Sequence, residues 1–279
     1  MSSPGLSLFG FMDRPQALKH LKSVCVIDNP SEGALALQWK AARARLGEPI
    51  RDAGNPRIEP IPAKYQAYIK RLTTEPWVAT LMKGPMKGCA FKMVEIDPLL
   101  AYQYTIDVAR AGRICDKLGK PPSVEEMLNI CLQRESLGEN VLMSRQANSV
   151  AIKSRNLNLQ ILNQGMVGKN TIGITFGWSS PLVQVVVHKG KHYLHNGFHR
   201  AYGLRMAGAE MMPCVLRTVS DYDAIGVRDD GATFGPQYFE NGNPPALGHY
   251  GQGRAYEVQL RAATRILNVS WSEHVMSDE

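Results

Sequence analysis

The residues best suited to chemistry lie in one short stretch, from His195 to Leu204. Asn196 and Gly197 mark a sharp turn after a strand-like segment, and His199 and Arg200 fall in the first turn of an expected helix. The first N–H groups of a helix have no partner within it, and the helix dipole adds partial positive charge there. These N–H groups, an imidazole and a guanidinium could together bind one phosphate.

Each residue of this turn has an expected role in such a phosphate site. Arg200 would neutralise phosphate charge, and His199 would hydrogen-bond a phosphate oxygen. Gly197 would let the anion approach the backbone, and Asn196 could cap the helix or bind the ligand. In the alternative, Gly197 serves only the geometry of the turn, and His199 and Arg200 are solvated or pair with a carboxylate. The strand–turn–helix context favours the phosphate site.

The elements that must position this turn are a hairpin before it and a helix and a strand after it. Residues 182–195 are rich in β-branched side chains, and Lys189-Gly190 within them predicts a hairpin turn. Residues 198–207 predict a helix with Gly208 as its C-terminal cap, and residues 212–219 predict a further strand.

Periodicity and turn residues predict the remaining elements. Helices are expected at residues 31–46 behind Ser31, at 63–72, at 99–118, and from Ser123, which forms a capping-box pattern with Glu126, to near Gly138. Strands are expected at residues 91–96 and 171–176 and within 258–271, whereas 49–62, the region from Pro76 to Gly88, and 227–255 read as breaks or loops. Together these elements predict an α+β protein.

Composition excludes several classes of protein. Of the 279 residues, 44% are hydrophobic and 20% are charged, which excludes wholesale disorder. No apolar run reaches the roughly 18 residues that a membrane-spanning helix needs. The N-terminus lacks a basic region followed by an apolar run, so we expect no secretory signal.

Cysteines and charge indicate the compartment and the kind of partner. The five cysteines are widely spaced and form no Cys-x-x-Cys pair, so we expect reduced, mostly buried thiols in a cytoplasmic protein. The net charge of +7 is compatible with an anionic partner, either a nucleotide or nucleic acid. A solvated basic surface without a partner explains the same charge equally well.

Two further groups of residues have both a functional and a structural interpretation. Four histidines lie between His188 and His199, but no metal-binding motif is present, so we expect no dedicated metal site. Arg110, Arg113, Lys117 and Lys120 could contact nucleic-acid phosphates. No aromatic residues alternate with them, which favours a solvated face.

The run from Pro181 to Leu216 resembles the ParB/sulfiredoxin superfamily. It has an apolar strand at Leu182–Val187, a Gly-x-His-Arg box at Gly197-Phe198-His199-Arg200, a small-residue helix ending at Gly208, and a Val-Pro-x-x-Val-like strand at Met212-Pro213-Cys214-Val215. The Asn-Gly-Phe-His-Arg string is also similar to the Asp-Gly-Gln-His-Arg box of a branch tied to DNA-modification systems.

This resemblance implies a ParB/sulfiredoxin-like domain that binds a nucleoside triphosphate with Mg²⁺ at Gly197, His199 and Arg200. Sulfiredoxins carry a reactive cysteine where this chain has Phe198, so reduction of a cysteine sulfinate is not expected. The DNA-clamp branch has Glu-Arg after the glycine and a downstream helix-turn-helix, and neither is visible here. Hydrolysis or phosphate transfer needs an acid or base, and Glu95 and Asp97, with His199, are the candidates. In the alternative, Asp97-Pro98 is an ordinary strand-ending turn.

The sequence therefore predicts a Pro-rich, helical extension at residues 1–90, the ParB/sulfiredoxin-like domain at 91–220, and a loop with C-terminal strands at 221–279. The leading hypothesis is a cytoplasmic nucleotide-binding protein that hydrolyses the nucleotide or transfers phosphate, with no membrane partner. One alternative is a DNA-binding or DNA-cleaving protein of a plasmid, phage or defence system. Another is a non-catalytic interaction module. A homodimer is compatible with each of these.

Overall fold

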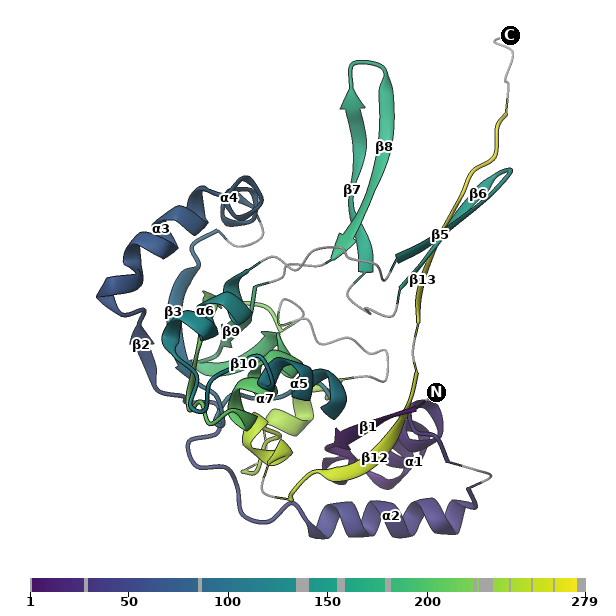
Figure 1. Cartoon of the computed structure of the whole chain (residues 1–279). Helices are drawn as coiled ribbons and strands as arrows, with labels where there is room; N and C mark the ends of the chain where they lie inside the picture. Colours follow the sequence, from purple (N-terminus) through teal and green to yellow (C-terminus); the bar gives the residue numbers. More distant parts are fainter. Residues whose placement is uncertain are drawn as a thin grey trace. The chain divides into compact units, whose positions relative to one another are not determined.

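The computed structural model describes residues 2–27, 30–84, 87–133, 141–154, 159–178, 182–222, 225, 233–240, 242–251, 253–262 and 264–274 (Figure 1). The chain is a mixture of helices and several sheets, so the predicted α+β class is confirmed. It divides into two compact units. The first unit comprises Met1–Gln133 and Leu182–Arg261, and the second comprises Arg134–Pro181 and Ala262–Glu279. The division predicted at residues 90 and 220 stays a prediction.

A five-stranded sheet forms the centre of the first unit, in the order β10-β9-β11-β3-β2. Its strands are β2 (Ile58–Pro60), β3 (Ala90–Glu95), β9 (Gln184–His188), β10 (Lys191–Asn196) and β11 (Met211–Thr218). β9 and β11 are parallel, and the other neighbours are antiparallel. The strands predicted at 91–96, within 182–195 and at 212–219 are confirmed.

The hairpin and the helix after it follow from local signals. Lys189 and Gly190 both have positive φ, 47° and 76°, as a type I′ hairpin turn requires. Helix α7 (Phe198–Met206) begins after Gly197 and is followed by Gly208, whose φ is 91°. The N–H of Gly208 donates to the Arg205 carbonyl, so the predicted helix and its glycine cap are confirmed.

A second sheet of the first unit joins segments distant in sequence. Strand β1 (Ser2–Ser7) lies between β12 (Tyr256–Arg261) and β4 (Thr105–Asp107), antiparallel to both. Gly5 of β1 faces Leu260, since a Cβ at Gly5 would lie 2.5 Å from that side chain. Residues 2–7 and 256–261 are therefore part of the same packed unit.

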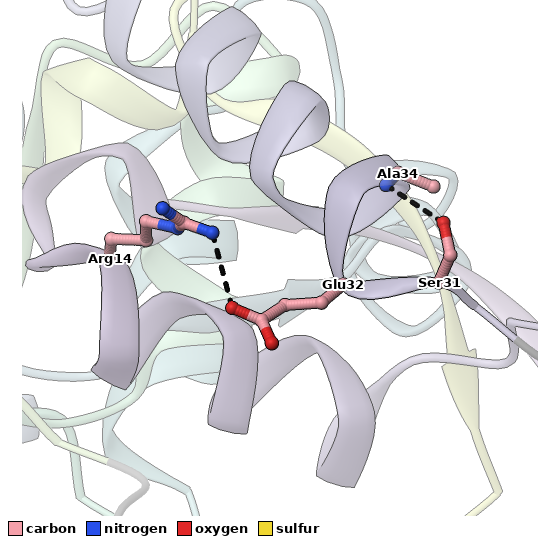
Figure 2. Close-up of polar contacts among 4 residues, drawn as sticks. All are labelled: Arg14, Ser31, Glu32 and Ala34. Carbon is pink, nitrogen blue, oxygen red and sulfur yellow. Dashed lines mark hydrogen bonds and ion pairs between the residues drawn. The ribbon is translucent and has the colours of Figure 1, made fainter.

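The helices of the first unit begin at recognisable caps. They are α1 (Arg14–Val24), α2 (Glu32–Ala44), α3 (Gln66–Thr74), α4 (Pro76–Lys83), α5 (Val108–Cys115) and α6 (Val124–Leu132). Figure 2 shows the start of α2, where Ser31 Oγ accepts the N–H of Ala34 at 3.1 Å and Glu32 pairs with Arg14. The predicted cap of α2 and the Ser123–Glu126 capping box of α6 are confirmed, as is the helix predicted at 63–72.

Two sequence-based predictions were wrong in part. The expected helix at 99–118 is helical only from Val108 to Cys115, because the N–H of Leu100 donates to His192 and its carbonyl accepts from Leu194. These sheet-like bonds hold Leu100 extended while its side chain is buried, so tertiary contacts override the helical spacing. Pro76 begins α4 at the position where its missing N–H is tolerated, although we expected a break there.

Two other boundaries also differ from expectation. Helix α6 ends at Leu132 with Gln133 extended, and residues 134–140 of the longer predicted helix lie outside the described residues. The predicted loop at 227–255 contains short 3₁₀ turns at Pro236–Phe239 and Leu247–Tyr250, while residues 226–232, 241 and 252 lie outside the description.

The second unit consists of strands alone in its described part. A three-stranded sheet has the order β13-β6-β5, from β5 (Val141–Gln146), β6 (Ser149–Ser154) and β13 (Arg265–Ser270). A separate two-stranded ribbon joins β7 (Leu159–Gly168) to β8 (Thr171–Trp178) (Figure 1). The predicted strand at 171–176 and the late strands are confirmed, whereas β5, β6 and β7 were not anticipated.

Candidate functional site

The turn between β10 and α7 requires glycine for two reasons. Gly197 has φ of 106°, a left-handed conformation that other residues adopt only with strain. A Cβ at Gly197 would lie 2.8 Å from Cγ2 of Val183 in the neighbouring strand segment. Gly197 is itself the N-terminal cap of α7, and Asn196 instead donates from Nδ2 to the Leu182 carbonyl at 3.3 Å. The start of α7 therefore has no capping side chain among the described residues.

His199 connects the start of α7 to the start of α5. Its Nε2 accepts the backbone N–H of Asp107 at 3.2 Å. Asp107 caps α5, since Oδ1 accepts the N–H of Arg110 at 2.9 Å and Oδ2 accepts the hydroxyl of Ser3 at 3.0 Å. Because Nε2 accepts a hydrogen bond, the neutral imidazole must carry its proton on Nδ1.

The surroundings of His199 keep it neutral. Burial is the main cause that lowers its pKa to about 3, and the positive charges of Arg110, Arg200 and Arg113 lower it further. Asp107 opposes this shift. A general base works best with a pKa near the working pH, so this environment favours a binding role for His199 over proton transfer.

The charges of three arginines act on this imidazole, and we call Arg110, Arg113 and Arg200 the arginine cluster. Within the described part of the chain, the guanidinium groups of Arg110 and Arg113 form no ion pair with a carboxylate. The nearby carboxylate of Asp107 is occupied by backbone and hydroxyl donors. Arginines that lack an acidic partner, as Arg110 and Arg113 do among the described residues, are typical of a site that binds an anion.

Close packing of two helices brings the cluster together. A Cβ at Gly203 of α7 would lie 2.8 Å from the Ala111 carbonyl and 3.0 Å from Ile114 of α5. Glycine at this position lets the two helix backbones approach closely. Since Arg110 and Arg113 belong to α5 and Arg200 to α7, this contact sets the spacing of the three cations.

Among the described residues, no hydrogen bond or ion pair joins Glu95 or Asp97 to this turn. Asp97 binds Arg205 through two contacts of 2.5 and 3.1 Å, and Glu95 accepts the N–H of Arg57 at 3.0 Å. Arg205 lies in the last turn of α7, roughly 9 Å along the helix axis from His199 and on a different face. The acid–base role expected for these two carboxylates therefore has no contact with residues 196–200 to support it.

Phe198 occupies a structural position within the box. Its side chain is buried and meets the ring of Tyr102 edge-on at 5.3 Å, and the Tyr102 hydroxyl donates to the His195 carbonyl. Cys131 is also fully buried in the range of the Arg200 charge, and burial raises the pKa of its thiol to about 12. Neither residue presents a reactive group at the turn. Of the five cysteines, four are buried and Cys89 is half-buried, as expected.

The other three histidines between residues 188 and 199 bind separate parts of the backbone. His188, His192 and His195 each place Nδ1 against a different carbonyl, those of Val219, Gly54 and Ile225. Among the residues that the structure describes, no group of three His, Cys, Asp or Glu side chains could hold a metal ion. In the same residues, no helix is long and apolar enough to cross a bilayer.

No protein-family model, curated protein or solved structure matches this chain. The resemblance to the ParB/sulfiredoxin superfamily therefore rests on the motifs between residues 181 and 216 alone. The geometry adds four residues that the motif did not identify: Asp107, Gly203, Arg110 and Arg113. The i, i+3 spacing of the two arginines was visible in the sequence, but their position beside His199 depends on how α5 packs on α7.

Proposed function

We propose that this chain is a nucleotide-binding protein of the ParB/sulfiredoxin type, with the phosphates of a nucleoside triphosphate at Asn196–Arg200. The observation that carries the proposal is the arginine cluster around a neutral His199 at the start of α7. Phosphate groups would supply the negative charge that the guanidinium groups of Arg110 and Arg113 lack among the described residues. The N-terminus of a helix without these arginines would be much weaker support for a phosphate site.

Each residue of the proposed site has a distinct role in binding the phosphates. Gly197 adopts the left-handed turn after which the first N–H groups of α7 could bind a phosphate oxygen. Arg200 provides a forked pair of donors, and Nδ1–H of His199 is the donor that its tautomer leaves for the ligand. Arg110 and Arg113 contribute long-range attraction. The described residues offer no cluster of metal ligands, so Mg²⁺ would arrive bound to the phosphates.

Hydrolysis or phosphate transfer would use the same charges to stabilise the transition state. Asp97 could assist only after it leaves Arg205, with which it forms a two-contact ion pair. We therefore expect Asp97→Asn to leave nucleotide affinity unchanged. A large loss of affinity in that variant would place Asp97 in the binding site and contradict the separation derived above.

A thermal-shift titration with ATP, CTP, GTP and ADP, each with and without Mg²⁺, tests the proposal. A ligand that binds only the folded state raises the unfolding temperature by mass action. We expect one nucleotide to raise it in the wild type and in Arg51→Ala, whose parent side chain is almost fully exposed. Arg200→Ala should abolish the shift. The absence of a shift with every nucleotide would reject the proposal.

DNA phosphate is the alternative ligand for the same cluster, because Arg110 and Arg113 are spaced along one face of α5. DNA binding would weaken steeply with added salt. Tight, salt-sensitive DNA binding that free nucleotides do not displace would favour this alternative.

A further inference from the structure

We propose that the β7–β8 ribbon of the second unit is a self-association surface that packs against the same ribbon of a second copy of this chain. The ribbon has only two strands, and no third strand pairs with either within the described residues. A two-stranded hairpin alone is marginally stable in water, so its exposed apolar face calls for a cover. This proposal is independent of the phosphate site.

The side chains of the ribbon separate into two unlike faces. Along β8, Ile172, Ile174 and Phe176 alternate with Thr171, Gly173 and Thr175. The pairing register places Met166 opposite Ile172, Gln164 opposite Ile174, and Ile161 opposite Phe176. Since directly opposed residues share a face, one face carries Ile161, Met166, Ile172, Ile174 and Phe176 with a single polar residue, Gln164, and we call it the apolar ribbon face.

This face is largely exposed to solvent. Ile172 is 79% exposed and Met166 is 62% exposed, and Ile161 and Ile174 also count among the exposed large hydrophobic residues. Isolated exposed apolar residues are ordinary, but a contiguous apolar strip on a narrow ribbon is typical of an interaction surface. The opposite face of β8 carries Thr and Gly, which form no apolar surface for a partner to cover.

The chemistry of the ribbon favours a second copy over other occupants. No charged residue occurs between Leu159 and Gly168 or between Thr171 and Trp178, so the strands offer no cation to nucleic-acid phosphates. The tip is Lys169-Asn170, a polar end that opposes insertion into a lipid bilayer. The apolar ribbon face is itself a matching uncharged surface, and a two-fold dimer uses one patch twice.

Size predicts how strong this association should be. Eight residues at about 3.4 Å each make a ribbon face roughly 27 Å long, and packed sheets lie about 10 Å apart. Two such narrow faces bury less than the roughly 1,200 Å² total area of standard stable interfaces. We therefore expect a concentration-dependent dimer with a dissociation constant in the micromolar range.

Sedimentation velocity of the full chain from about 1 to 200 µM tests this inference. We expect the wild-type mass to rise from 30.9 kDa toward twice that value. The double variant Ile172→Asn/Ile174→Asn should weaken the dimer at least tenfold. Thr175→Asn adds the same side chain on the opposite face of the same strand and should leave the dimer unchanged.

Circular dichroism and unfolding temperature must match the wild type in each variant. If the double variant misfolds, Met166→Gln on β7 probes the same face. A wild type that stays monomeric at the highest concentration would overturn the inference, as would equal weakening by Thr175→Asn. A monomer in solution that binds anionic vesicles through Ile172 would overturn it in favour of a lipid surface.

Discussion

At the scale of single residues, Gly197 is the position on which the geometry of the proposed site depends. Its left-handed backbone and the nearby Val183 side chain both exclude a Cβ. We expect Gly197→Ala to lower the free energy of unfolding by about 3 kcal/mol, from backbone strain of about 1–2 kcal/mol and overpacking of about 1–3 kcal/mol. Urea denaturation at 25 °C measures the loss.

Gly190 provides a matched control for this substitution. Its φ is also positive, at 76°, but a Cβ there would meet nothing within 4 Å. Gly190→Ala should therefore show only the backbone strain of about 1–2 kcal/mol. Equal losses in the two variants would mean that the contact with Val183 relaxes without cost and that the turn is less constrained than its geometry indicates.

At the scale of elements, the start of α6 shows how a local cap supports the helix that packs on β11. The Ser123 hydroxyl and the Glu126 carboxylate each bond the backbone of the other residue, and these donors lower the pKa of Glu126. Ser123→Ala should reduce the free energy of unfolding by about 1 kcal/mol. Glu125→Gln, at an exposed neighbour in the same first turn, should change it by less than about 0.5 kcal/mol. Chemical denaturation of both variants compares the two, and a Ser123→Ala loss as small as that of Glu125→Gln would show that the capping box adds little.

Elements with a strong local signal were the ones that the sequence predicted. The 182–195 hairpin, the 198–207 helix and the 123–126 capping box each depend on residues a few positions apart. Strand β1 was not anticipated, because Pro4 and Gly5 are poor strand formers and its partners lie about 100 and 250 residues away. The start of α5 after its cap Asp107 could not be predicted either, because backbone hydrogen bonds to residues far away in the sequence hold the preceding Leu100 extended.

In the candidate site, too, the features set by neighbouring residues could be predicted and those set by distant residues could not. Gly197, His199 and Arg200 could be identified because they are adjacent in sequence and form a turn and a helix start. Their contacts with α5 could not, because those depend on Gly203 of one helix meeting Ala111 of another. Local spacing thus predicts which residues form the turn, and only the packing of helices predicts which charges surround it.

At the scale of the whole molecule, His20 and His249 join His199 as neutral histidines that make the free energy of unfolding depend on pH. His20 and His249 each have a pKa lowered to about 4, mainly by burial, against about 6.5 in the unfolded chain. The unfolded state therefore binds more protons between these values. The contribution of these neutral histidines to the free energy of unfolding is fully present above about pH 6.5 and is lost as the pH falls toward 4. Each histidine lowers the free energy of unfolding by up to about 1.4 kcal/mol per pH unit over this range.

Urea unfolding between pH 7 and about 4.5 measures this slope. We expect His249→Gln to reduce it, because His249 is fully buried with its Nδ1 on the Ala246 N–H. His274→Gln, at an exposed position, should leave the slope unchanged. A flat profile for the wild type over this range would contradict the assignment of both histidines as neutral in the folded state.

The central claim is that phosphate binds at Arg200, and isothermal titration tests it most directly. Wild type, Arg200→Ala and Arg51→Ala are titrated with the nucleotide that gives a thermal shift and with inorganic triphosphate. Loss of a charged hydrogen bond of about 1.5–3 kcal/mol predicts a dissociation constant roughly ten to a hundred times higher in Arg200→Ala for both ligands. Arg51→Ala should bind as the wild type does. Equal dissociation constants in wild type and Arg200→Ala would contradict the claim.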